Sequence, residues 1–135
     1  MSVAVAHQPS ATGRLTIREG AEEAERRGTS LSVIEVAEGV DVDLLEAQRG
    51  RRRQEIATIL DEADLTQVEW TLELVTGVEV AETVLDHVAG SDVELLVIGA
   101  RRRNPVGKLI LGSVTQSILL KADMPVLVVK PPARA

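Results

Sequence analysis

Short apolar runs alternate with longer amphipathic segments along this chain, and the alternation limits the folds open to it. The apolar runs have strand length, and the segments between them have helix length; the runs are 2–6, 31–36, 68–75, 93–100 and 125–130. With right-handed crossovers, this order predicts a doubly wound α/β fold, a five-stranded parallel sheet flanked by helices. The 135 residues suffice for one such domain, 1–135.

We expect two of the predicted strands to be buried to different extents. Residues 95–98 are apolar at every position, which is typical of a strand buried on both faces in the middle of a parallel sheet. Residues 68–75 instead alternate apolar and polar side chains. We therefore expect the third strand to lie at an edge of the sheet.

The predicted helices have distinct start and stop signals. Pro9, Ser10 and Gly13 predict irregular structure over 7–13, and Gly28 predicts the end of the first helix. A stripe of small and apolar residues on this helix suits close packing on a sheet: Ile17, Gly20, Ala21 and Ala24. The second helix is expected over 43–63, interrupted or bent near Gly50. A third follows Gly77, and the last is expected over 113–122.

Charge and aromatic content argue against nucleic-acid binding. The formal net charge is −6, and Trp70 is the sole aromatic residue, so no stacking platform for bases is available. The run Arg51–Arg53 resembles a basic patch, but the acidic balance of the whole chain disfavours that interpretation.

Cysteine and hydropathy patterns bear on the cellular compartment. The chain has no cysteine, which excludes disulfides, thiolate metal sites and a cysteine nucleophile. No apolar run approaches the length of a membrane span, and the first residues lack the pattern of a signal peptide. We expect a cytoplasmic protein that does not bind membranes.

The segment 99–117, "GARRRNPVGKLILGSVTQS", has the outline of a phosphate-binding loop. It is not a Walker loop, because Leu109 follows Gly107-Lys108 and Arg102 stands where the first glycine belongs. The dinucleotide fingerprint G-x-G-x-x-G does not occur in the chain. If this segment binds phosphate, it does so through a different pattern.

That pattern is similar to one found in the universal stress protein family. Members carry G-x-x-G after the fourth strand, then nine residues, then Gly with Ser or Thr; this chain has Gly99, Arg102, residues 103–111 and Gly112-Ser113. The stretches "LLVIGA" and "LILGSVTQSILLKADMPVLVV" also resemble the family, and the resemblance covers the whole chain. It implies strand order 3-2-1-4-5 in an adenine nucleotide alpha-hydrolase-like fold.

The resemblance also implies a nucleotide or phosphate site. In many members this loop binds ATP phosphates and ribose, so ATP or AMP is the ligand to consider. The corresponding residues here are Gly99, Arg101, Arg102, Gly112, Ser113, Val114 and Thr115. Arg102 replaces the second glycine, and three roles are open to it: a clamp on phosphate, a plug in the site, or an exposed loop residue.

A second departure lies at the end of the first strand. Nucleotide-binding members usually place an aspartate there, whereas this chain has Ala6 followed by His7. Because the first and fourth strands flank the switch point of a doubly wound sheet, we expect His7 to face the same cleft as the 99–113 loop. His7 is then either a contact to base or ribose or an ordinary loop histidine.

The start of the last helix allows two compatible interpretations. Ser113 and Gln116 have the spacing of a capping box, in which both side chains satisfy free amides. The same amides, at the positive end of the helix dipole, favour an anion.

Catalytic and metal-binding signals are weak. No G-x-S-x-G elbow occurs, and Asp86 and His87 are adjacent on a helix and so point to different sides. Two histidines without cysteine make no convincing metal cluster. We expect no enzymatic activity and no metal site.

The last strand suggests self-association. Val126 and Val128 face one side, Leu127 and Val129 the other, so both faces are apolar at the sheet edge where a terminal strand ends. Family members commonly dimerise through this strand, which implies a homodimer interface at Val126 and Val128; covering of the edge by a loop is the alternative.

Together these features predict a non-catalytic universal stress protein-like domain, a stress-response homodimer with lost or weakened nucleotide binding. The alternative is a stress-response regulator that binds ATP or AMP through the 99–115 loop. The sequence indicates no protein partner beyond a second copy.

Overall fold

The structure, a computed structural model, describes residues 1–37, 39, 41–103 and 106–132, with the side chains of all of these except Ala11, Arg102 and Arg103. A five-stranded sheet runs through it in the order β3-β2-β1-β4-β7, and every pairing is parallel. Its strands are β1 (Ser2–Ala6), β2 (Ser30–Ala37), β3 (Trp70–Thr76), β4 (Val93–Gly99) and β7 (Val126–Val129). The predicted strand order is confirmed, and β3 and β7 lie at the two edges.

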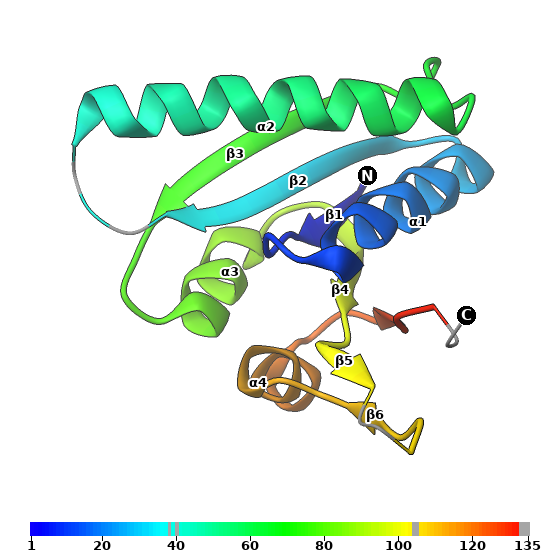
Figure 1. The fold of residues 1–135 in the computed structure, drawn as a ribbon, viewed down its shortest axis with the longest axis vertical. Helices are drawn as coiled ribbons and strands as arrows, with labels where there is room; N and C mark the ends of the chain where they lie inside the picture. Colours follow the sequence, from blue (N-terminus) through cyan, green and yellow to red (C-terminus); the bar gives the residue numbers. More distant parts are fainter. Residues whose placement is uncertain (38, 40, 104–105, 133–135) are drawn as a thin grey trace.

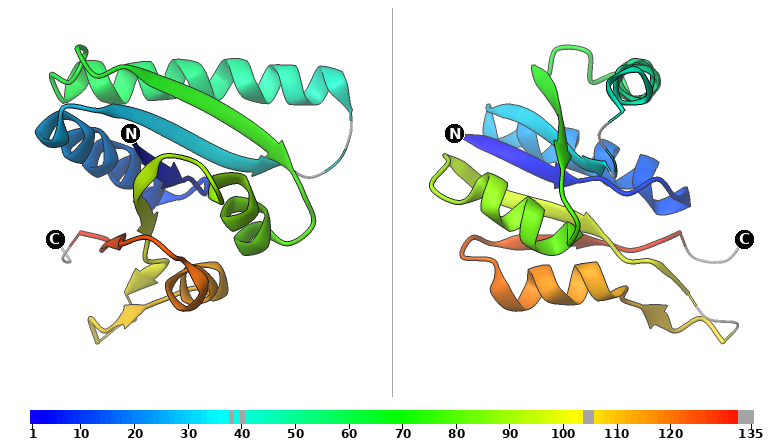
Figure 2. Two further views of the ribbon diagram at one scale, coloured as in Figure 1. Left: turned by 180° about the vertical axis from the view of Figure 1, so that it is seen from behind. Right: turned by 90° about the vertical axis from the view of Figure 1, so that its left-hand side faces the viewer.

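Helices cover both faces of the sheet (Figure 1 and Figure 2). Those on one face are α1 (Ala11–Arg27) and α2 (Val42–Glu62), and those on the other are α3 (Val80–Val88) and α4 (Ser113–Lys121). The doubly wound α/β prediction is therefore confirmed. In the described ranges, every helix is too short or too polar to span a membrane.

Alternation along the central strands divides the core between the two faces. In β1, Val3 and Val5 pack under α1 and α2, whereas Ala4 packs toward α3 and α4. In β4, Leu96 and Val97 divide in the same way, and all of Leu95–Ile98 is buried, as the continuous apolar run predicted.

Helix α1 begins earlier than predicted. The prediction of irregular structure over 7–13 is wrong for residues 11–13, because the Ser10 hydroxyl accepts a hydrogen bond from Gly13 N at 3.0 Å and caps a helix that starts at Ala11. The helix ends at Gly28, whose φ of 64° is left-handed, so that stop signal is confirmed. A side chain at Gly20 would collide with Val5, which explains the small-residue stripe.

Helix α2 is continuous through Gly50, so the predicted interruption there is wrong. The side chain of Asp41 caps its start by accepting from two amides. Gln48 and Arg52, on either side of the glycine, both donate to the Glu35 carboxylate of β2. These contacts hold the helix on the sheet across the weak position.

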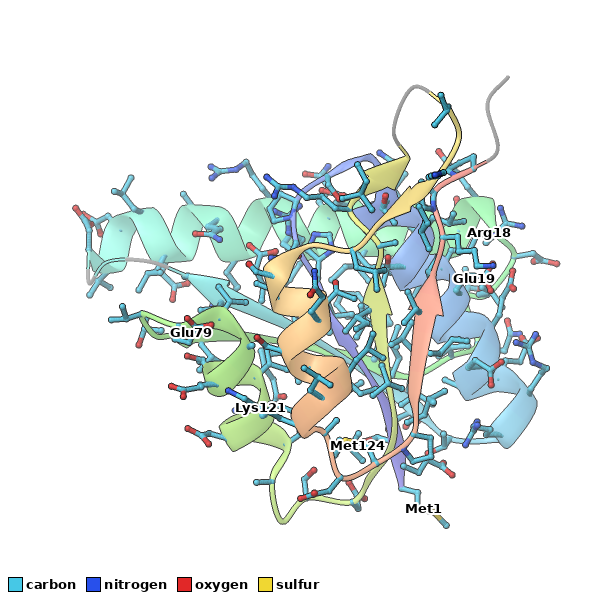
Figure 3. All side chains as sticks on the ribbon, turned by 90° about the horizontal axis from the view of Figure 1, so that it is seen from below. Met1, Arg18, Glu19, Glu79, Lys121 and Met124 are labelled. Carbon is cyan, nitrogen blue, oxygen red and sulfur yellow. The ribbon has the colours of Figure 1, made fainter. Side chains whose placement is uncertain are left out.

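The segment between β4 and α4 contains a small antiparallel pair that the sequence did not predict. Strand β5 (Arg102–Arg103) pairs with β6 (Leu109–Ile110), with Arg102 opposite Ile110. This hairpin and the start of α4 lie at one end of the molecule, whereas Lys121 lies at the far end of that helix (Figure 3). The hairpin therefore lies beside the carboxyl end of β4.

Candidate functional site

A pocket of about 360 Å³ lies at the carboxyl ends of the neighbouring strands β1 and β4. From β1 the chain crosses to α1 on one face, and from β4 it continues through the hairpin to α4 on the other face. This is the switch point of the sheet, where ligands bind in doubly wound folds. The described residues that line the pocket belong to the ranges 6–16 and 99–115.

The first turn of α4 forms one wall of the pocket. Gly112 is its N-cap with extended backbone, and no described side chain caps the helix. The predicted capping box is therefore wrong: Ser113 is already the first helical residue, and Gln116 Nε2 donates to Leu111 O at 3.0 Å. Ser113, Val114 and Thr115 all line the pocket, so their end of the helix offers uncapped amides to it.

The first turn of α1 forms the opposite wall. Ser10, Thr12 and Gly13 line the pocket there. The Thr12 side chain is 3% exposed, and its hydroxyl makes no hydrogen bond to a residue that the structure describes. Two helix N-termini and the hydroxyl of the buried residue Thr12 thus meet at one cavity, an arrangement that favours an anion.

Gly99 is required by packing at the base of the pocket. A Cβ on this residue would come within 2.7 Å of Thr16 Oγ1 and 2.9 Å of Thr12 Cγ2. Its carbonyl oxygen accepts a hydrogen bond from Thr115 Oγ1 at 2.8 Å, which ties β4 to α4. A Cβ on Gly112 would meet only Arg101 Cδ at 3.5 Å, an ordinary contact.

Of the two arginines predicted at this site, the structure describes the side chain of Arg101 and not that of Arg102. Arg101 lines the pocket, its side chain is exposed, and it makes no ion pair with a described residue. The side chain of Arg102 lies outside what the structure describes, so its three predicted roles stay open. Arg101 is the one charged side chain among the described lining residues.

Ala6 and His7, the residues considered as contacts to base or ribose, lie in different surroundings. Ala6 lines the pocket with Gln8 and Pro9, and none of the described lining residues is acidic. His7 does not line it: the imidazole is buried on the α2 side of the sheet, with Nε2 3.6 Å from Glu35 Oε1. The expectation that His7 faces the cleft is therefore wrong.

His7 belongs to a buried polar cluster that the sequence analysis missed. Glu35 accepts from Arg52 Nε at 2.6 Å and from Gln48 Nε2, and Arg52 also pairs with Glu55 at 2.5 Å. Neither nitrogen of His7 makes a hydrogen bond to a described residue. Burial, and next the nearby Arg52 guanidinium, lower the pKa of His7. The lone carboxylate in the apolar strand "LSVIEV" was the signal for this cluster.

A second polar group lies on the opposite face. His87 Nε2 is 2.7 Å from Glu73 Oε2, which also accepts from Ser32 Oγ at 3.0 Å. His87 thus meets Glu73 rather than its neighbour Asp86. Nowhere in the described part of the chain do three or more His, Asp or Glu side chains gather in a set able to hold a metal ion.

Comparisons with known proteins agree with the fold. Residues 1–130 match the model of the universal stress protein family. A universal stress protein from Mycolicibacterium smegmatis is 40% identical over 129 residues, which cover 96% of this chain and 97% of that protein.

Two solved structures of universal stress proteins from Archaeoglobus fulgidus superpose on this chain. The first has a TM-score of 0.72 and 30% identity, covering 95% of this chain and 97% of its own. The second, in complex with dAMP, has a TM-score of 0.69 and 26% identity, covering 95% and 96%.

Proposed function

The chain belongs to the universal stress protein family, and from this premise we propose that it binds an adenine nucleotide, ATP or AMP, between α1 and α4 without catalysing a reaction. The observation that carries the proposal is the pocket at the carboxyl ends of β1 and β4, where two helix N-termini converge. Its volume of about 360 Å³ lies in the range of small-molecule sites. The relative from Archaeoglobus fulgidus in complex with dAMP supports the choice of nucleotide.

The proposed binding is weak on the nucleoside side of the pocket. Ala6, Gln8 and Pro9 form that wall, and none carries a charge. The acidic contact that the family resemblance implies at Ala6 is missing, so a carboxylate that could accept hydrogen bonds from ribose or base is absent from this position. Most of the binding free energy must then come from the phosphate side.

The proposed lack of catalysis rests on the chemistry of the lining. Among the described residues of the pocket, the one charged side chain is Arg101, and a guanidinium is a poor general acid or base. The described lining residues include no imidazole or carboxylate that could activate the hydroxyls of Ser10, Ser113 and Thr115.

We also propose that the protein forms a homodimer through β7. The carbonyl oxygens of Pro125 and Val129 accept hydrogen bonds from β4, so the alternate residues Val126 and Val128 direct their backbone groups to the free edge. Pairing with a second copy of β7 would satisfy those groups.

Calorimetric titration with AMP and with ATP tests nucleotide binding, and Gly112→Asp provides the matched variant. An aspartate is a preferred N-cap, so it would bond the first-turn amides of α4 and maintain folding while repelling phosphate. We expect wild type and Gly112→Ala to bind and Gly112→Asp to lose affinity by about tenfold or more.

A second candidate function is a dimeric interaction subunit that has lost nucleotide binding. The missing acidic contact at Ala6 favours it. Absence of heat with both nucleotides would support this candidate, and equal binding by wild type and Gly112→Asp would place any nucleotide outside the pocket.

A further inference from the structure

The pocket is built from the two longest stretches of the chain that contain no acidic residue. Each of its described lining residues lies within 1–18 or 95–122, and neither stretch contains Asp or Glu. The whole chain has 21 acidic residues and a formal net charge of −6, so they all lie elsewhere in the sequence. An acidic protein therefore has a cavity whose described lining residues include no negative side chain.

Arg101 supplies a cation to this cavity. Its side chain lies beside Gly112, the N-cap of α4. A Cβ added to that glycine would be 3.5 Å from Arg101 Cδ and 3.8 Å from Arg101 Cβ. Because the guanidinium is exposed and has no ion-pair partner among the described residues, it is available to a bound anion. A guanidinium can bond phosphate oxygens in a bidentate manner, beside amides that bond others.

Thr12 provides an independent sign of a ligand on the α1 wall. Thr12 is 3% exposed and lines the pocket, and its hydroxyl lacks a hydrogen bond to any described residue, whereas the hydroxyl of Thr115 donates to Gly99 O. A hydroxyl at the wall of a cavity can donate a hydrogen bond to a group bound there. An anion between the two helix starts would accept that hydrogen bond.

The same lining is poorly suited to a magnesium ion. Nucleotide sites usually hold magnesium with one or two carboxylates together with the phosphates. The stretches 1–18 and 95–122 offer no carboxylate, and the Arg101 charge repels a divalent cation. Magnesium also halves the negative charge of a nucleoside triphosphate, which weakens its attraction to the arginine and to the two helix N-termini.

We propose that this pocket binds the phosphate chain of a nucleotide as a free polyanion, without a divalent cation, and that affinity rises with the number of phosphates. The proposal rests on the proposed nucleotide binding and goes further by naming the charge state of the ligand. The amides of α1 and α4 bind the phosphate next to the nucleoside, and Arg101 neutralises the further phosphates of ADP and ATP.

Calorimetric titrations of the full chain with AMP, ADP and ATP, in EDTA and in excess magnesium chloride, test the proposal. In EDTA we expect ATP to bind about tenfold more tightly than AMP, and we expect magnesium to weaken ATP binding by about threefold or more. Inorganic triphosphate should compete with ATP if the phosphate chain supplies the affinity; failure to compete at high concentration would contradict that role.

Two variants locate the effect. Arg101→Gln should remove most of the difference between ATP and AMP, whereas Arg18→Gln, an exposed arginine on α1 outside the pocket, should preserve it (Figure 3). Three results would overturn the inference without touching nucleotide binding itself. Magnesium could strengthen ATP binding, AMP and ATP could bind with equal affinity, or Arg101→Gln could keep the wild-type difference in affinity between ATP and AMP. Absence of binding by every nucleotide in both buffers would instead refute the proposed function on which it rests.

Discussion

The Nε2 atom of His7 lies 3.6 Å from Oε1 of Glu35, and the two side chains are 1% and 2% exposed. The separation exceeds an ordinary hydrogen bond, and the carboxylate is already engaged by Arg52 and Gln48. His7 is therefore a buried imidazole without a hydrogen-bond partner among the described residues, and it is neutral because burial and the Arg52 charge lower its pKa.

This neutral histidine predicts a loss of stability in mild acid. The unfolded chain takes up a proton on His7 near pH 6.5, whereas the folded chain does so only at lower pH. As pH falls between these two values, the His7 contribution to the free energy of unfolding decreases by up to about 1.4 kcal/mol per pH unit.

Urea denaturation at pH 7.5 and pH 5 measures this effect, in a His87→Gln background that leaves His7 as the single histidine. Adding His7→Gln should make the pH dependence shallower, since glutamine does not titrate. The account of His7 is wrong if both proteins lose the same free energy between the two pH values.

The Arg52 ion pair with Glu35 predicts a large difference between neighbouring arginines. Arg52→Ala leaves the Glu35 carboxylate buried without a cation and should cost about 3–5 kcal/mol in the free energy of unfolding. Arg53→Ala removes a guanidinium stacked 5.0 Å from the Trp70 ring centre and should cost about 1 kcal/mol. Urea denaturation of both variants at pH 7 checks this, and equal costs would contradict the assigned role of Arg52.

Packing at the base of the pocket predicts unequal tolerance of the two glycines. Gly99→Ala forces a Cβ against Thr16 and Thr12 and should destabilise the fold by about 1–3 kcal/mol. Gly112→Ala has room beside Arg101, and its free energy of unfolding should stay within about 0.5 kcal/mol of wild type. Chemical denaturation compares them; a Gly99→Ala variant as stable as Gly112→Ala would show that the close approach of β4 and α1 is not required.

The edge position of β7 predicts a proline-sensitive dimer. Val128→Pro removes an N–H that points to the free edge and leaves the bonds between β4 and β7 in place, so it should yield monomers in light scattering. Val128→Ala keeps the N–H and should remain dimeric. A dimeric Val128→Pro variant, or a monomeric wild type, would rule out pairing through this strand.

Most of the fold could be predicted from the sequence because its signals are local. The continuous apolar run 95–98 indicated a central strand, and the alternation around Leu72 indicated an edge strand. Gly28 marked the end of α1 because a left-handed residue is required there. The irregular structure predicted at residues 11–13 and the break predicted at Gly50 were wrong, since a capping hydroxyl and contacts to Glu35 outweighed weak local propensity.

The site was less predictable because its residues are placed by tertiary contacts. The spacing of Gly99 and Gly112 located the pocket, but Ser113 proved to be inside α4 rather than its cap. His7 directly follows β1, as a pocket residue would. Its side chain instead packs near Glu35 and Arg52, in a buried polar cluster on the α2 side of the sheet. A pairing between residues 7, 35 and 52 leaves no periodic signal in a single sequence.

Backbone amide chemical shifts on addition of AMP test the central claim most directly. If the pocket holds the nucleotide between two helix starts, the largest shifts should occur at Thr12, Gly13, Ser113 and Val114, with little change around Ser91, which lies before the amino end of β4. Saturating AMP that leaves those four amides unmoved would contradict the account.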